Sequence, residues 1–165
     1  MMNEAVLELQ TLLSGLMTTR CKKYYAGNVG IPVKAYLPAL MVIEHGTRVE
    51  RQSTETDMYR HSVSILVVTD MVKSLNEAGV ADRIVKNRAA LRKIFEEADT
   101  TTRAPKTDTV LGALMKKSSM TGTWFTYNIN GEVNYDWQPE TPQSFYYVAA
   151  ELRLDLFTNF VPRFA

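Results

Sequence analysis

The sequence is poor in cysteine, in long apolar runs and in net charge. The one cysteine, Cys21, cannot form a disulfide within the chain and fits a reducing compartment. Apolar stretches such as residues 65–68 are far shorter than the roughly 20 residues that span a bilayer. The 19 basic and 18 acidic residues give a formal charge of +1, which excludes strong electrostatic binding of duplex DNA by the molecule as a whole.

Sequence signals for targeting, metal binding and catalysis are also missing. The first residues carry Glu4 where a secretory signal has basic residues, so we expect synthesis in a cytoplasm and no cleaved signal. No His-x-x-x-His, Cys-x-x-Cys, calcium loop or glycine-rich phosphate loop occurs. The two histidines, His45 and His61, have no nucleophile beside them in a recognisable local motif. We therefore predict no catalytic residue, no bound metal and no cofactor.

Two stretches have the apolar spacing of amphipathic helices. In residues 3–19 the stripe consists of Val6, Leu9, Leu13 and Leu16. Residues 80–98 carry a second stripe, and the opposite side of this helix is basic and includes Arg88. A short apolar run at 110–115 fits either a strand or a helix. Glycine, proline or threonine residues punctuate 20–38 and 100–107, and we predict that both segments are irregular.

Three segments have the pattern of strands. Residues 39–51 begin with a buried run, residues 59–69 alternate, and the polar connection at 52–57 predicts that the two strands form an antiparallel pair. Near the C-terminus, leucines at 152, 154 and 156 alternate with charged residues, which predicts one apolar and one charged face. The charged face carries Glu151, Arg153 and Asp155, where a base stands between two acids.

A glycine near the middle of residues 123–137 predicts a hairpin. If Gly131 takes the left-handed position of a three-residue loop, Tyr127 pairs with Val133 and Phe125 with Tyr135. This register collects the apolar side chains on one face, whereas a two-residue loop would set aromatic residues against polar ones.

Together these segments predict one α+β domain over residues 1–165. Two helices pack on one face of a mainly antiparallel sheet, and the hairpin extends from it. Because no chemical site stands out, the best functional candidates are charged and aromatic side chains suited to contact with another subunit or partner. They are Glu44, Arg48, Arg60, Arg88, Trp124, Glu151, Arg153 and Asp155.

This layout resembles the tail-terminator and neck proteins of tailed bacteriophages. The resemblance consists of an amphipathic helix at 4–19, a proline-led strand at 38–44, an alternating strand at 59–68, a second helix, and a closing strand at 148–156. It is one of order and pattern over nearly the whole chain. It implies a virion protein of six copies in a ring, which caps the tail tube, joins it to the neck or connector, and lets genomic DNA pass through its lumen without sequence readout.

Other functions compete with this interpretation. A head–tail adaptor or a tail-completion protein of the phage neck would share the fold. A small cytoplasmic enzyme or ligand-binding protein would need His45 or His61 beside a carboxylate in a concave pocket. A nucleic-acid-binding module would use Arg20, Lys22 and Lys23 together with the basic helix.

Overall fold

The computed structural model describes residues 4–30, 32–51, 56–70, 80–116, 124–137 and 147–162. Its α-helices are α1 (Glu4–Leu16), α2 (Val80–Glu96) and α3 (Val110–Lys116), and a short 3-10 turn, η1, spans Lys34–Tyr36. Its strands are β1 (Lys23–Ala26), β2 (Ala39–Arg51), β3 (Thr56–Asp70), β4 (Trp124–Ile129), β5 (Asn134–Trp137) and β6 (Tyr147–Pro162). No helix among these residues is long and apolar enough to cross a membrane.

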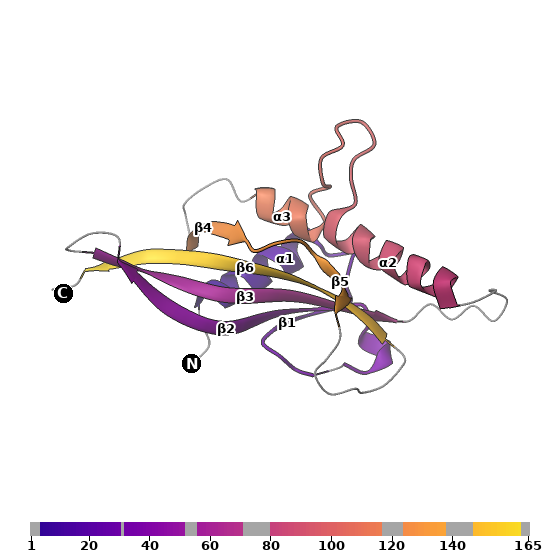
Figure 1. Cartoon of the computed structure of the whole chain (residues 1–165), viewed down its shortest axis with the longest axis horizontal. Helices are drawn as coiled ribbons and strands as arrows, with labels where there is room; N and C mark the ends of the chain where they lie inside the picture. The colour runs from indigo at the N-terminus through magenta and orange to yellow at the C-terminus, as the bar shows by residue number, and fades with distance from the viewer. Residues whose placement is uncertain are drawn as a thin grey trace.

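All six described strands belong to one mixed sheet, which confirms the α+β class. The strand order is β1-β2-β3-β6-β4, and β5 also pairs with β6. Strand β1 runs parallel to β2, and the other pairings are antiparallel. The three long strands β2, β3 and β6 form the centre, and at the end where β6 finishes they extend beyond the helices (Figure 1).

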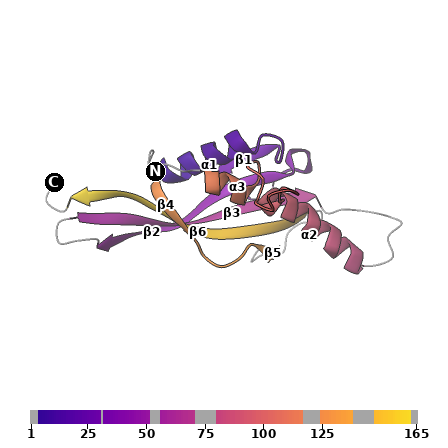
Figure 2. The same ribbon diagram turned by 90° about the horizontal axis from the view of Figure 1, so that it is seen from above.

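Helices α1 and α3 lie over one face of the sheet (Figure 2). The apolar run at 110–115, for which the sequence allowed either structure, is helical, so the described chain has three α-helices. All three helices contribute to the main core, whose fully buried members include Leu9 and Leu13 of α1, Phe95 of α2 and Leu114 of α3. Each such side chain contributes about 1.5–3 kcal/mol on burial.

A second apolar cluster lies on the other face of the sheet, at the end where β1 pairs with β2. It consists of Leu37, Ala39, Met41, Leu66, Val68, Tyr147 and Ala149. Residues on alternate positions of the same strands, such as Leu40 and Val67, belong to the main core. The continuous apolar runs of β2 and β3 therefore coincide with the part of the sheet that is buried on both faces.

The segment 20–38 is not irregular throughout, because it contains β1. Lys23 to Ala26 pair in parallel with Ala39 to Val42, and the Gly27 N–H donates to the Val42 carbonyl at 2.8 Å. Gly27 has a φ of 124°, a conformation that residues with a side chain rarely adopt. The strand ends there, so β1 covers only the first part of the β2 edge.

The predicted hairpin at 123–137 is wrong in its pairing. Strands β4 and β5 do not pair with each other; both pair with β6 in the same antiparallel sense, one after the other. Gly131 does have a positive φ of 80°, but it interrupts one edge strand and does not reverse the chain. The predicted faces hold, because Tyr127, Val133 and Tyr135 pack on the main core. The sixteen residues of β6 offer both segments a longer partner than they offer each other.

Two further boundaries differ from the sequence prediction. Of the polar connection at 52–57, residues 56 and 57 belong to β3, and residues 52–55 lie outside the described residues. Strand β6 extends to Pro162, well past the charged stretch that marked it in the sequence. This extension lets β6 pair with the whole of β3, from Thr56 to Asp70.

Candidate functional site

A network of ion pairs lies on the sheet face that is turned away from α1 and α3. Its centre is Arg60 of β3, which donates to Asp155 of β6 from Nε at 3.0 Å and from Nη2 at 2.7 Å. The third nitrogen, Nη1, donates to Glu50 of β2 at 2.8 Å. One guanidinium thus joins the three central strands, and the ring of Phe157 lies 5.9 Å from it.

Asp155 is the most deeply buried member of this network. Its side chain is 2% exposed, compared with 29% for Arg60 and 30% for Glu50. Burial alone would raise the pKa of Asp155, but hydrogen bonds from Arg60, Asn130 and Ser62 outweigh this effect and hold the pKa below its usual value. The carboxylate is therefore ionised at neutral pH although it is buried.

Two more predicted arginines flank the network with exposed side chains. Arg48 lies directly opposite Arg60 in the sheet register, and Glu50 approaches both, at 3.6 Å from Arg48. Farther along β6, Arg153 donates to Glu151 at 2.9 Å. Arg48 and Arg153 are 67% and 65% exposed, whereas Glu151 is buried. The carboxylates therefore lie close to the sheet, and these two guanidiniums point outward from it.

Glu44 belongs to a different cluster, on the helix-covered face. The Thr47 hydroxyl donates to Glu44 at 2.6 Å and lies 2.9 Å from Nδ1 of His61. Since a hydroxyl has one proton, Nδ1 of His61 carries the hydrogen of that contact. In the neutral ring Nε2 is then the acceptor toward the Thr158 hydroxyl, at 3.0 Å. Burial lowers the pKa of His61, and the charge of Glu44 partly offsets this effect.

The remaining histidine, His45, lies at a bulge in β2, where the register with β3 shifts between Glu44 and Gly46. Its Nε2 is 2.5 Å from the Ser64 hydroxyl. Ser64 is three residues from His61 along β3 and therefore lies on the opposite face of the sheet, away from the helices. The two histidines are thus on opposite faces and do not form one site.

Arg88 lies apart from the other candidates, on α2. It donates to Asp136 of β5, from Nε at 3.1 Å. Four positions on, the Arg92 guanidinium lies 5.1 Å from the centre of the Tyr135 ring and 3.5 Å from Glu96. Burial, with the nearby charge of Glu96, raises the pKa of Tyr135 to about 12. These contacts attach the helix to β5.

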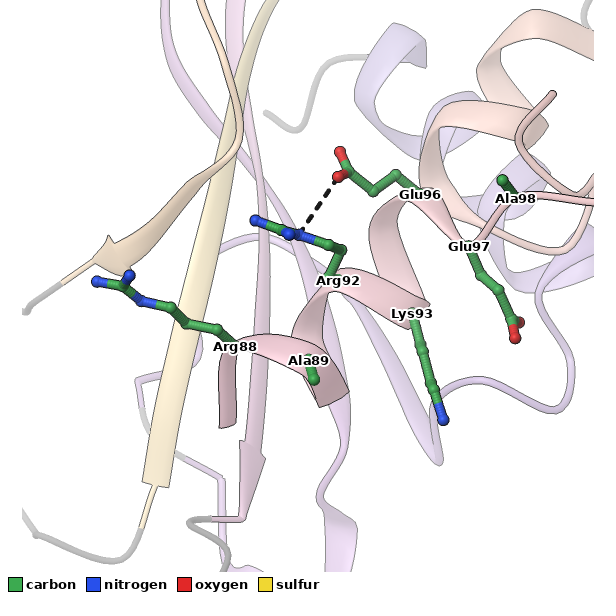
Figure 3. Close-up of a pocket in the computed structure, with 7 residues that line it drawn as sticks. All are labelled: Arg88, Ala89, Arg92, Lys93, Glu96, Glu97 and Ala98. Atoms are coloured by element: carbon green, nitrogen blue, oxygen red, sulfur yellow. Dashed lines mark ion pairs between the residues drawn. The ribbon is translucent and has the colours of Figure 1, made fainter. Parts of the chain in front are cut away.

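A hollow lies along α2, shown in Figure 3. It is lined by Arg88, Ala89, Arg92, Lys93, Glu96, Glu97 and Ala98. Every one of these residues belongs to α2 or follows it directly, so no second described element closes over the hollow. Its bases and acids lie near one another, and Arg92 faces Glu96 in the close-up (Figure 3).

An ion cluster that the sequence analysis missed connects the ends of the helices. Arg20, which follows α1, donates to both carboxylate oxygens of Asp108 at 3.0 Å and to Glu97 at 2.5 Å. Glu97 follows α2, and Asp108 precedes α3. Hydrogen bonds from Arg20 are the largest cause that lowers the pKa of each of these carboxylates. Arg20 therefore links the ends of the three helices, and its side chain is 16% exposed.

The structure brings together some of the sequence candidates and separates others. Arg60 and Asp155 are in direct contact, and Arg48 is linked to them through Glu50, which the sequence analysis did not select. The sequence could have indicated Glu50, because it is two residues from Arg48 and therefore lies on the same face of the strand. For Trp124 only the backbone position in β4 is described.

In these contacts, basic and acidic side chains of the same chain compensate one another's charge. No group of three or more potential metal ligands occurs among them. His61 does lie 3.7 Å from the Glu44 carboxylate, but neither residue lines the hollow on α2.

No protein-family model matches the sequence, and a search of curated proteins finds no match.

Proposed function

We propose that this chain is a structural protein of a tailed-phage virion, of the tail-terminator type. Copies of it form a ring, six by the resemblance, that caps the tail tube and joins it to the neck or connector. Genomic DNA passes through the lumen without sequence readout. The ring is assembled in the host cytoplasm, and its action is blocking and docking with no covalent chemistry.

The observation that carries this proposal is the open sheet with two different outer edges. One edge is formed by β1 and β2, and the other by β4 and β5. A cyclic ring needs two different patches on each subunit, because every contact joins one patch to the other. A single open sheet provides such a pair, and the elements follow one another along the chain in the order of the resemblance.

The polar face of the sheet also supports a role in assembly. It presents Arg48 and Arg153 outward while the acids beneath them hold the guanidiniums in place. Charged groups arranged in this way favour orientation and partner choice more than raw affinity. A face of this kind suits docking against a tube or neck protein.

The proposal is tested by the mass and shape of the purified protein. Light scattering should give the mass of a closed oligomer, and negative-stain images should show rings with a central opening. A particle that remains a single chain at every concentration, alone and with tail tubes, would contradict the proposal.

Genetic removal distinguishes a terminator from the other neck proteins. Loss of a terminator should give tails of abnormal length, because nothing stops the polymerisation of the tube. Loss of a head–tail adaptor or a completion protein should give tails of normal length that are not attached to heads.

The enzymatic alternative requires a histidine beside a carboxylate, and His61 lies beside Glu44, so this alternative is tested as well. His45 and His61 are both replaced by glutamine, which retains hydrogen bonding and removes imidazole chemistry. Normal virion assembly by this double variant would exclude catalysis by either histidine. Loss of assembly by a variant that is correctly folded would favour the enzymatic alternative.

A further inference from the structure

The edge of β2 is covered by β1 over only part of its length. The pairing with β1 ends at Val42, where Gly27 turns the chain away. Over residues 45–50, none of the strands that the structure describes lies on the side of β2 away from β3. A strand in that position presents backbone N–H and C=O groups that can pair with another chain.

On the opposite edge of the sheet, β4 lies at the same height along the strands as the uncovered part of β2. In the register, Gly46 of β2 is opposite Ser62 of β3, Ser62 is opposite Asp155 of β6, and Asp155 is opposite Asn128 of β4. The described part of the chain has no strand beyond β4 on this side. The two outer edges are therefore aligned across the sheet and not displaced along the strands.

Strand directions also match those of a continued sheet. Because β2, β3, β6 and β4 alternate in direction, β2 and β4 run opposite ways. A second copy placed beside the first in the same orientation would set its β4 antiparallel to the first copy's β2. This is the pairing that the rest of the central sheet already uses.

We propose that neighbouring copies join by strand addition, with β4 of one copy against residues 45–50 of β2 in the next. This inference rests on the proposed function, since it names the contact that builds the ring. Asn128 of one copy then lies beside Gly46 of its neighbour. Main-chain hydrogen bonds hold the contact, and Val49, which is 54% exposed, adds apolar surface to it.

The charges on β2 fit a selective edge. Arg48 and Glu50 lie within the proposed contact, and charged side chains on an edge strand discourage pairing with arbitrary strands. The face of the sheet around Gly46 carries serine, asparagine and arginine, and among the described side chains none of the exposed large apolar residues lies on it. The edge, which needs hydrogen-bond partners, is thus a better contact than the face.

A pair of cysteines tests the alignment directly. Gly46→Cys and Asn128→Cys are introduced into one chain, and the protein is oxidised after negative-stain images confirm that it still forms rings. A Cβ at Gly46 would meet no heavy atom within 4 Å, so the first substitution should be tolerated. Directly opposite residues of antiparallel strands have Cα atoms about 4.5–5.5 Å apart, which a disulfide can bridge.

Any disulfide formed must join two copies. Within one copy the two positions are three strand spacings apart, about 14 Å, which exceeds the roughly 7 Å limit for a disulfide. The native Cys21 does not interfere, because it is buried and its pKa is raised to about 12. The matched control is Gly46→Cys with Lys93→Cys, which places the second thiol on exposed α2.

The expected result is a ladder of cross-linked species on a non-reducing gel, up to the closed ring, that a reductant collapses to one band. The control should give at most a trace of dimer. Intact rings without the ladder, or equal ladders from both variants, would overturn strand addition and leave the proposed function standing. Absence of both rings and ladder, in the variant and in the unmodified protein, would overturn both proposals.

Discussion

Replacement of Asp155 by asparagine tests the ion-pair network most directly. The substitution keeps the shape of the side chain and removes its charge, while Arg60 retains Glu50 as a partner. Asp155 accepts two hydrogen bonds from Arg60 and one, at 3.3 Å, from Ser62. Hydrogen bonds to a charged group are worth about 1.5–3 kcal/mol each, and desolvation of the carboxylate offsets part of the sum. We expect the free energy of unfolding to fall by about 2–3 kcal/mol.

The same substitution should behave differently when Arg60 is absent. In an Arg60→Met background, Asp155 would be a buried carboxylate without its cation, and burial would then dominate its pKa. Asp155→Asn should therefore cost nothing or even stabilise the protein in that background. Such a reversal in a double-mutant cycle separates a specific pair from a general effect of the substitution at either site.

The pH dependence follows from the direction of the pKa shift. The folded protein lowers the pKa of Asp155, so the stability it contributes is present above the unfolded pKa, near 4. That contribution is lost as the pH falls through the folded value. The difference between the unmodified protein and Asp155→Asn should therefore be full at pH 7 and shrink below about pH 4.

Urea unfolding, followed by circular dichroism, measures these effects. With a slope of about 1–3 kcal/mol per molar urea, the expected loss shifts the midpoint down by about 0.7–3 M. The reasoning is refuted if Asp155→Asn changes the free energy of unfolding by less than about 0.5 kcal/mol, the level of an ordinary surface substitution. It is also refuted if the cost is unchanged in the Arg60→Met background.

Three other predictions concern the core, the helix ends and the cysteine. In chemical denaturation, Leu154→Asp should lower the free energy of unfolding by more than about 4 kcal/mol, because Leu154 is 0% exposed. Arg153→Ala should change it by no more than about 0.5 kcal/mol. Similar effects from both substitutions would mean that the faces of β6 are assigned wrongly. Arg20→Ala should cost about 2 kcal/mol and Lys22→Ala almost nothing, and equal costs would refute the helix-connecting role of Arg20. Cys21 should react with a thiol reagent only as fast as the protein unfolds, and rapid labelling of the native protein would contradict its burial.

The sequence was most informative where one repeating pattern determines a whole element. The predicted strand at 39–51 has the bounds of β2, and the predicted helix at 80–98 contains α2. The faces of β6 were also predicted correctly, because Leu152, Leu154 and Leu156 are buried in the main core. In each case burial of one face requires the alternation or helical spacing that is visible in the residues themselves.

What the sequence did not reveal depends on partners that are distant along the chain. Strand β1 has only four residues, and its pairing with β2 supplies the evidence that it is a strand. The hairpin was mispredicted because Gly131 and the alternation fit a local reversal equally well. Only the presence of β6 along the whole segment decides between the two arrangements.

The candidate site, too, could be predicted from the sequence only in part. The charged positions of β2, β3 and β6 were recognisable, but the pairing of Arg60 with Asp155 spans 95 residues of sequence. Of the two acids that flank Arg153 in the sequence, Glu151 pairs with it, whereas Asp155 pairs with the distant Arg60. Strand register decides which charges meet, and the register is set by the core on the opposite face.

The proposed strand addition gives the charges of the Arg60 network a physical rationale. Apolar residues at Arg60 and Asp155 could stabilise the fold as well as the ion pair does, because a buried pair gains little over well-packed hydrophobic groups. They would, however, turn the outer part of this sheet face into a flat apolar surface, which promotes association in any orientation. A compensated polar face avoids that outcome, since its charges already have partners within the chain. Under the proposed strand addition, contact between copies is then left to the backbone groups at the edges, where strand direction and level select one arrangement.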